Sequence, residues 1–390
     1  MKSIYLLPFI LLVQGNVLSS CKKDSATTPN LTLSENVYIA GANPTQHKAV
    51  ITVSLSAASG SQVSLTYSTL DGSAKAGQDF EGVTDGTITF SPGETSKTIE
   101  IPIIPEENLE LDENFKVNIS NVKNAKATLS TSTVTITNDN AYTAELAADG
   151  YITPTTYPGM ELLWADEFDE TGLNTTWWNY ETGGGGWGNH ELEFYTNSTD
   201  NVFIENGHLN IKALKNPVAE TYTSGRITTK GKKEFTYGRI DIRAKLPQGQ
   251  GIWPALWMLG ANISEVSWPA CGEIDIMEFL GNDLTKVYGS AHYDDGGHQF
   301  KTGSYALVAP DNYSTKFHVF TLMWQENSIR YYVDYHKYYE VIQNAIKFGT
   351  FRKPQFFIFN LAVGGDWPGS PNGTTVFPQT LVVDYIRVFQ

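Results

Sequence analysis

Residues 271–281 read CGEIDIMEFLG, with the acidic side chains of Glu273, Asp275 and Glu278 set among apolar ones. Side chains alternate between the two faces of a regular strand, so Glu273 and Asp275 share a face and position 277 comes next on it. Glu278 joins that face only if one extra residue is looped out in a β-bulge, a known way to re-aim a side chain beside an active site. The stretch therefore predicts a buried strand, a bulge at Ile276–Met277 and three carboxylates on one side.

Outward from this stretch, residues from about 161 to 390 predict strand after strand and no long amphipathic helix. Tyr237–Leu246 alternates polar and apolar side chains, the period of a β-strand. Other runs are apolar on both faces, which is typical of strands inside a sheet-on-sheet core: Val319–Trp324, Ile329–Asp334, Gln355–Leu361 and Leu381–Phe389. This part of the chain is expected to fold as an all-β sandwich.

The first third of the chain has another pattern. Short β-type runs such as Ala49–Leu55 alternate with turn signals such as Asp71-Gly72. About seven short strands over about 100 residues is typical of an immunoglobulin-like sandwich. Because 390 residues exceed one ordinary core, we expect two all-β domains, at residues 33–140 and 159–390, joined by a linker at residues 141–158.

The N-terminus predicts export. Lys2 precedes an apolar run, Ile4–Val13, that is far shorter than the roughly 20 apolar residues of a membrane span. Leu18–Cys21 resembles the lipobox that lipoprotein signal peptidase recognises. Residues 1–20 are then a signal peptide and residues 21–32 a flexible tether rich in Ser, Thr and Lys.

The lipobox implies that Cys21 becomes acylated. The chain would then be anchored by lipid to a bacterial membrane, facing the periplasm or the cell surface. The alternative is a generic signal peptide with an incidental cysteine. Cys271 is the only other cysteine, so an acylated Cys21 leaves no intrachain disulfide.

Composition narrows the class of partner. Aromatic residues make up 12% of the chain and charged residues 18%, which describes a globular protein rather than a disordered one. The formal net charge of -15 argues against nucleic acid or an anionic polymer, since both require clustered Lys and Arg. A neutral or cationic ligand fits better, although the acidity would also keep a secreted protein soluble.

Several carboxylates on one buried face are costly unless the protein uses them, because neighbouring like charges resist ionisation. Glycoside hydrolysis is such a use: one carboxylate attacks the anomeric carbon while a second, protonated one releases the leaving oxygen and then activates water. Carboxyl groups about 5–5.5 Å apart imply retention of configuration, and the bulged strand fits that separation. We assign Glu273 as nucleophile, Glu278 as acid/base and Asp275 as the group that tunes the nucleophile.

Two other interpretations of the acids remain. Clustered acids also bind calcium, but calcium loops place their ligands on turns containing Gly and Asn rather than on an Ile-rich strand. The second is an acid cluster with only a structural role.

From about Leu163 to the C-terminus the chain resembles glycoside hydrolase family sixteen, and within it the laminarinase-type endo-β-1,3-glucanases. Beside the acid stretch, the resemblance rests on motifs at Trp164–Phe168, Glu181–Asn189, Glu191–Thr196, Tyr237–Ile240, Gly251–Met258, Asn360–Gly369 and Val383–Val388. It implies a β-jelly roll with an open cleft across the concave sheet. Family members that cut mixed-linkage glucan or xyloglucan usually lack the extra residue, so the bulged form favours the laminarinase group.

Aromatic rings stack on the apolar faces of sugars, and Trp253, Trp257 and Trp268 bracket the acid strand. Any one of them has a core position as its alternative. The resemblance places Trp253 and Trp268 in the cleft. By the same matching, sugar hydroxyls would bond to Asn189 and Arg226, and His292 would lie near the acid/base. Relatives often carry Gln at the position of Glu193, which affects the polarity of one subsite.

The resemblance also implies a structural calcium ion on the convex face. Relatives hold it through backbone oxygens and one Asp, and the matching positions are Glu167, Gly207 and Asp384. Asp384 is alternatively a strand-edge acid. No cofactor is expected for the chemistry.

The N-terminal domain resembles a Calx-beta domain, on motifs at Tyr67–Ala74, Gly77–Phe80, Phe90–Thr95, Asp112–Phe115 and Ile136–Asp139. In that family acidic loop residues bind calcium, and the matching positions are Asp79, Glu106, Glu110, Glu113 and Asp139. Pro105 stands where relatives often have an acid. An inert spacer that lifts the next domain off the membrane is the alternative.

The sequence thus predicts a monomeric, retaining endo-hydrolase of laminarin-type β-1,3-glucan that contacts a membrane only through a lipid anchor. A relative acting on mixed-linkage β-glucan or on a galactan such as agarose is the second enzyme hypothesis. A binding-only protein on the same scaffold is a third, which the presence of all three acids disfavours.

Overall fold

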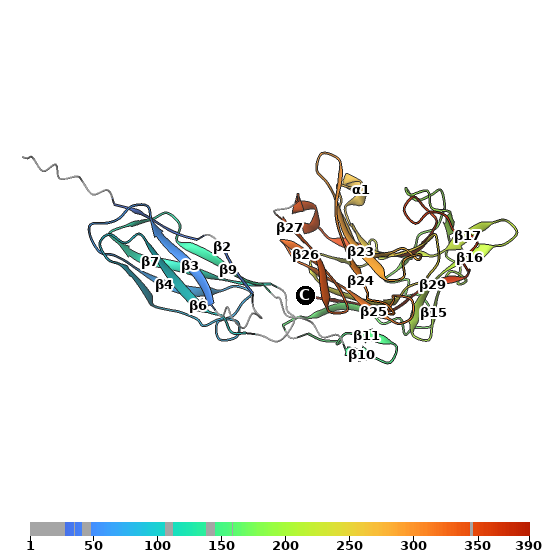
Figure 1. Cartoon of the computed structure of the whole chain (residues 1–390), viewed down its shortest axis with the longest axis horizontal. Coiled ribbons are helices and arrows are strands. Elements are labelled where there is room, and N and C mark those ends of the chain that lie inside the picture. Colours follow the sequence, from blue (N-terminus) through green and yellow to red (C-terminus); the bar gives the residue numbers. More distant parts are fainter. Residues whose placement is uncertain are drawn as a thin grey trace, which may run out of the picture.

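The computed structural model describes residues 28–34, 36–40, 48–105, 112–137, 145–157, 159–343 and 346–390. The expected signal peptide and Cys21 lie outside these residues, as do Glu106, Glu110 and Asp139. Strands dominate both halves of the chain (Figure 1). Within the part that is described, no helix has the length and apolar character needed to cross a bilayer.

The N-terminal domain is a sandwich of two sheets with strand orders β6-β3-β1-β8 and β2-β9-β7-β4-β5. Its strands are β1 (Asn30–Leu33), β2 (Asn36–Ala40), β3 (Lys48–Leu55), β4 (Val63–Asp71), β5 (Gly86–Phe90), β6 (Ser96–Pro102), β7 (Glu113–Lys123), β8 (Lys126–Ala127) and β9 (Thr131–Thr137). Alternate residues of β3 are buried, and Phe80 stacks on Phe115 between the sheets, with ring centroids 3.9 Å apart. The predicted immunoglobulin-like sandwich is confirmed.

The second domain packs two larger sheets face to face, as the apolar runs predicted. The outer sheet has the order β14-β17-β16-β29-β20-β25-β26-β27, with β12 beside β29 and β15 beside β16. Its strands are β12 (Leu162–Asp166), β14 (Glu193–Tyr195), β15 (Val202–Glu205), β16 (His208–Asn216), β17 (Thr221–Ser224), β20 (Gly238–Lys245), β25 (His318–Trp324), β26 (Ser328–Val333), β27 (His336–Ile342) and β29 (Gln379–Phe389).

The inner sheet has the order β13-β18-β28-β21-β22-β23-β24, with β19 beside β28. Its strands are β13 (Asn179–Tyr180), β18 (Arg226–Thr228), β19 (Glu234–Phe235), β21 (Ile252–Gly260), β22 (Glu273–Phe279), β23 (Lys286–Asp294), β24 (His298–Ala306) and β28 (Gln355–Val363). Two short helical turns, α1 (Ile263–Val266) and η2 (Phe348–Arg352), join strands. Every residue of β25 and β28 is buried, which explains why these runs are apolar on both faces. The all-β jelly roll is confirmed.

The described part of the expected linker is ordered. It forms the hairpin β10 (Glu145–Ala147) and β11 (Gly150–Ile152). The N–H of Tyr151 donates to the carbonyl of Phe317 at 3.0 Å, and the N–H of Phe317 donates to the carbonyl of Asp149 at 2.9 Å. Residues 145–157 therefore belong to the second domain as a strap across its outer sheet.

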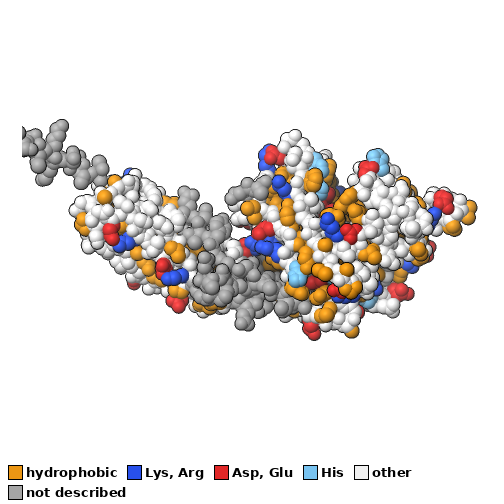
Figure 2. Space-filling model, viewed as in Figure 1, with side chains coloured by type: hydrophobic (Ala, Val, Ile, Leu, Met, Phe, Trp, Pro, Cys, Tyr) orange, Lys and Arg blue, Asp and Glu red, His pale blue; other side chains and the backbone are white. Residues whose placement is uncertain are grey.

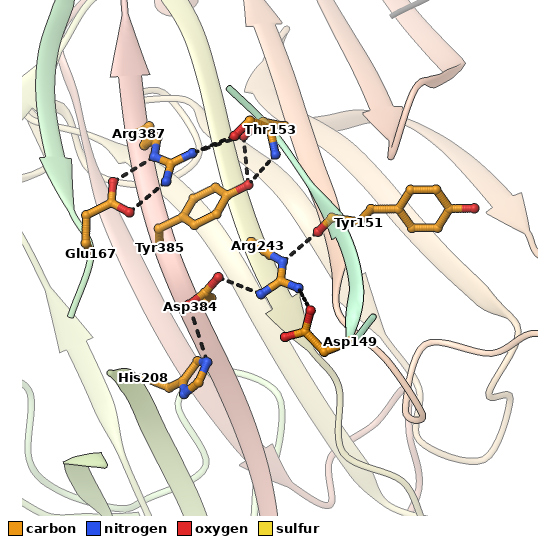
Figure 3. A network of polar contacts seen from close by, with 9 residues as sticks. All are labelled: Asp149, Tyr151, Thr153, Glu167, His208, Arg243, Asp384, Tyr385 and Arg387. Carbon is orange, nitrogen blue, oxygen red and sulfur yellow. Dashed lines mark hydrogen bonds and ion pairs between the residues drawn. The ribbon is translucent and has the colours of Figure 1, made fainter. Parts of the chain in front are cut away.

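Two buried arginines fasten this strap (Figure 3). Arg243 donates to the carbonyl of Tyr151 at 2.5 Å and to the carboxylate of Asp149 at 2.8 Å. Arg387 donates to the carbonyl of Thr153 at 2.9 Å. Each guanidinium also pairs with a carboxylate outside the strap, Arg243 with Asp384 and Arg387 with Glu167. The strap therefore satisfies the N–H groups that these carboxylates leave unpaired.

The strap also carries a polar anchor at its end. The hydroxyl of Tyr157 donates to Asp241 at 2.7 Å, and Asp241 is fully buried beside Arg239. We predict that Tyr157→Phe lowers the free energy of unfolding by about 1–3 kcal/mol, because a buried carboxylate loses a donor. Tyr151→Phe is the matched control, since that hydroxyl points away from the network (Figure 3). Chemical denaturation of both variants measures the difference, and equal stabilities would contradict the anchoring role.

Candidate active site

The pairing of β22 with its neighbours contains the bulge that the sequence predicted. Asp275 lies opposite Ser290 and Glu278 opposite Tyr288, so Ile276 and Met277 together face one residue of β23. Both of those side chains are buried in the core between the sheets. The extra residue therefore restores Glu278 to the face that Glu273 and Asp275 occupy.

A cleft of about 760 Å³ opens over this face of the inner sheet. All nine residues expected at the substrate site line it, namely Asn189, Arg226, Trp253, Trp257, Trp268, Glu273, Asp275, Glu278 and His292. They come from strands β18, β21, β22 and β23 and from two loops. The jelly roll thus brings together side chains that are up to about 100 positions apart in the sequence.

Glu273 accepts one hydrogen bond and has one basic ring nearby. The indole N–H of Trp268 donates to its Oε2 at 3.0 Å, and Nε2 of His292 lies 3.9 Å from Oε1. Burial, aided by the charge of Asp275, raises the pKa of Glu273, whereas His292 and Trp268 lower it. These two neighbours favour the charged form that a nucleophile needs.

Glu278 has a different environment. Its Oε1 accepts one hydrogen bond, from the indole N–H of Trp253 at 3.2 Å. Burial, together with the charges of Asp275 and Glu273, raises its pKa well above the usual range. A carboxyl that keeps its proton near neutral pH is suited to be the general acid.

Asp275 lies between the two, and burial raises its pKa to about 8. Nε2 of His292 approaches its Oδ2 at 3.2 Å. Because three neighbouring carboxyl groups cannot all ionise cheaply, the cluster retains protons near neutral pH.

A metal site was the alternative interpretation of the acids. Glu273, Asp275 and His292 each offer an atom within 4.8 Å of the others. However, Trp268 already donates its indole N–H to Glu273, and Nε2 of His292 lies 3.2 Å from Oδ2 of Asp275 as an ion-pair contact. This arrangement favours acid/base chemistry over ion binding.

The cleft wall also carries the expected polar residues Arg226 and Asn189. The Arg226 guanidinium lies between the rings of Trp187 and Trp257, 4.7 and 5.0 Å from their centroids, and donates to Glu181 at 2.5 Å. Asn189 donates to Glu191 at 3.1 Å. Arg226 is thus a fixed donor platform beside two aromatic faces.

Glu193 does not line the cleft but is buried beneath it. The N–H of Val363 donates to its Oε2 at 2.6 Å. Burial, together with the charge of Glu191, raises its pKa to about 8. A protonated Glu193 carries no charge, like the Gln of relatives. Because Glu191 lines the cleft and Glu193 does not, Glu193 can affect a subsite only by its contact with Glu191.

Sequence reasoning missed several residues of the cleft wall: Trp187, Glu191, Tyr288, His298, Phe300, Asn360 and Trp367. Asn360 accepts from the indole of Trp257 at 2.8 Å, and Trp367 packs edge-on against Trp253. His298 and Phe300 start β24, two residues apart on one face of an exposed strand. The spacing of two between His298 and Phe300, in a strand that follows the predicted His292, could have predicted that both side chains face the cleft.

The three positions expected to hold calcium lie on adjacent strands of the outer sheet. Glu167 follows β12 and Gly207 precedes β16, and both strands pair with β29, which carries Asp384. Both carboxylates already have partners: Arg387 holds the two oxygens of Glu167 at 2.7 Å, and Arg243 holds Oδ2 of Asp384 at 2.6 Å (Figure 3). The other oxygen of Asp384, Oδ1, lies 3.3 Å from Nε2 of His208. This oxygen and nearby backbone carbonyl oxygens are the atoms that could bind a calcium ion.

Comparisons with known proteins agree with this geometry. The sequence model described as glycosyl hydrolases family 16 matches residues 189–387, and that of the Calx-beta domain matches residues 28–140. Glucan endo-1,3-beta-glucosidase A1 of Niallia circulans is 41% identical over 263 residues, covering 60% of this chain and 38% of that protein. For the Beta-glucanase of Rhodothermus marinus the identity is 39%, covering 60% of this chain and 86% of that protein.

A solved structure shows the same fold. The laminarinase catalytic domain of Thermotoga maritima MSB8 is 47% identical, with a TM-score of 0.55, and the match covers 59% of this chain and 98% of that one. The match therefore concerns one of the two domains, the one that contains the cleft.

The Trp253 contact predicts a change in the titration of Glu278. Trp253→Phe removes a donor that favours the ionised carboxylate, so the pKa of Glu278 should rise further, by about half to one unit. Carbon-13 NMR of protein labelled at its Glu carboxyl groups measures the titration. Trp367→Phe, which changes a ring packed on Trp253, is the control, and an unchanged Glu278 titration in Trp253→Phe would contradict the assignment.

Proposed function

Because the chain belongs to family 16 of the glycosyl hydrolases, we propose that it cuts internal β-1,3 links of a laminarin-type glucan with retention of configuration. The observation that carries this proposal is the bulged strand β22, which turns Glu273, Asp275 and Glu278 into one cleft. The relatives named above as glucanases and as a laminarinase support the choice of substrate.

The reaction needs two displacements. In the first, Glu273 attacks the anomeric carbon while Glu278 gives its proton to the leaving glycosidic oxygen, so the negative charge passes from Glu273 to Glu278. In the second, Glu278 takes a proton from water, the water oxygen displaces Glu273 from the sugar, and both carboxyl groups return to their starting states. Asp275 and His292 lie beside Glu273, whose negative charge is lost in the first displacement and restored in the second.

The cleft suits a neutral chain of pyranose rings. Exposed faces of Trp268, Trp367 and Phe300 offer stacking surfaces, and Arg226 and Asn189 offer donors for hydroxyls. On the face seen in Figure 2, Lys and Arg side chains are interspersed with Asp and Glu rather than gathered in one basic patch. Among the residues that line the cleft, Arg226 is the one Lys or Arg, which supports a neutral polysaccharide over a sulfated one and over nucleic acid.

The proposal includes the setting that the sequence predicts. The chain acts as a monomer, held by a lipid on Cys21 at a bacterial membrane, with the first domain as a spacer or a calcium-binding module. Asp79 and Glu113 are the calcium candidates of that domain within the described residues. Asp79 accepts from the N–H of Lys75 at 2.5 Å, so it already has a partner.

The substrate is tested by measuring reducing-sugar release from laminarin, lichenan and agarose side by side. We predict the fastest release from laminarin and a first product with the β configuration in proton NMR. Glu273→Ser should lower turnover at least 10⁴-fold while laminari-oligosaccharides still bind. Activity on agarose alone would overturn the substrate, and hydrolysis by Glu273→Ser would overturn the nucleophile.

We also propose that calcium joins Asp384 to the backbone oxygens of Glu167 and Gly207. The ion would tie β12, β16 and β29 together and take no part in the reaction. Saturating calcium should raise the melting temperature by roughly 5–10 °C over that in a chelator. Scanning calorimetry of the wild type and Asp384→Asn, each with and without calcium, tests this. The site is wrong if both proteins respond alike.

A further inference from the structure

His292 has a second histidine behind it. His298, at the start of β24, presents Nε2 to Nδ1 of His292 at 2.8 Å. The two ring planes are nearly parallel, at 13°, and the ring centroids are 5.1 Å apart. With 2.8 Å between the two nitrogens, this centroid distance places the nitrogens close to the line that joins the rings, as a hydrogen bond in the ring plane requires. The other ring nitrogen of His292 faces Asp275 at 3.2 Å and Glu273 at 3.9 Å. A continuous line of polar contacts thus runs from the catalytic acids to His298 at the rim.

The 2.8 Å contact between Nδ1 of His292 and Nε2 of His298 has room for one proton, carried by one of the two nitrogens. When His292 is neutral and carries its proton on Nε2, the side that faces Asp275, its Nδ1 is bare and His298 must donate Nε2–H. When His292 is charged, its Nδ1–H donates to a bare Nε2 of His298. Two charged rings would place two N–H groups against each other. The pair therefore carries at most one positive charge, and His298 supports His292 in either state.

The surroundings place that charge on His292. Burial and the charge of His292 both lower the pKa of His298. Three carboxyl groups from β22, Glu273, Asp275 and Glu278, interact with His292. The rings packed on His298 are those of Trp268 and Phe300, with centroids 4.4 and 5.8 Å away. Asp294 lies opposite His298 across β23 and β24, but it is exposed and accepts from the N–H of Gly297. The acid that faces His292, Asp275, is buried.

We propose that His298 is a positioning residue of the reaction: it receives the Nδ1–H of a charged His292 and so keeps a positive charge against Asp275 and Glu273. This inference rests on the proposed function and deepens it. A charged His292 favours the ionised form of Glu273, which attacks the sugar. In the first displacement the negative charge moves from Glu273 to Glu278. His292 keeps its proton throughout this step and remains next to the acids.

Two substitutions separate this role from packing. His298→Phe keeps a flat ring against Trp268 and Phe300 but removes the acceptor, and His298→Gln supplies an amide oxygen that can accept. Without an acceptor, His292 gives up its charge more easily and the pKa of Glu273 rises. The acidic limb of the pH profile of kcat/KM should therefore move to higher pH in His298→Phe, by about half a unit or more. On that limb kcat/KM falls about threefold or more.

The readouts are pH profiles on laminarin and nitrogen-15 NMR of the His292 ring. We expect His298→Phe to shift the acidic limb, and the loss of charge from His292 to occur at lower pH, while His298→Gln stays close to the wild type. Coincident profiles of His298→Phe and the wild type would overturn the proposal. Equal shifts in both variants would also overturn it, because they would indicate a packing role.

The NMR titration of the His292 ring does not require a substrate, so it tests the role of His298 independently of the proposed function. If the wild type releases no sugar from laminarin, the substrate is wrong, yet NMR still reports whether His298 controls the charge of His292. An unchanged His292 titration in His298→Phe overturns the inference even in an active enzyme. Thermal denaturation of each variant establishes that it is folded.

Discussion

The cost of burying carboxylates governs this structure. Glu273, Asp275 and Glu278 share the face of one strand that forms part of the cleft wall, where Asp275 is buried, the two glutamates are half-buried and each charge loses part of its solvation. The protein meets that cost unequally. Each glutamate accepts one indole N–H, Glu273 from Trp268 and Glu278 from Trp253, and Nε2 of His292 lies 3.9 Å from Glu273. Burial raises the pKa of Glu273 to about 8 and that of Glu278 well above its usual range, so Glu273 is the first of the two to ionise as the pH rises.

The spacing of residues along the chain was enough to predict part of the fold. Runs such as Gln355–Leu361, apolar on both faces, can lie only between two layers, and β28 is indeed fully buried. The bulge was predictable because three acids with spacings of two and three cannot share a face of a regular strand. The resemblance added the distant residues of the cleft, such as Asn189 and Arg226, which strand periodicity alone does not connect to the acids.

Features that depend on contacts between remote polar groups were not predictable in the same way. Residues 145–157 have no apolar periodicity and were expected to be a linker, yet Arg243 and Arg387 hold them on the outer sheet. No local pattern reveals that two distant arginines need partners. His298 was missed for a related reason: its contact with His292 arises from the register of β23 and β24, in which His292 lies opposite Phe300 and Asp294 opposite His298.

The outer sheet also determines where the acids lie. Opposite the bulge, Gly289 leaves room for tyrosines of β26 and β27, because a Cβ there would lie 2.5 Å from atoms of both Tyr331 and Tyr338. The hydroxyl of Tyr331 donates to the carbonyl of Ser290, the residue paired with Asp275. Thus the strand facing the bulge is held from below by a side chain of the other layer. The spacing of the acids is therefore a property of how the two sheets pack, and the outer sheet contributes to the chemistry without reaching the cleft.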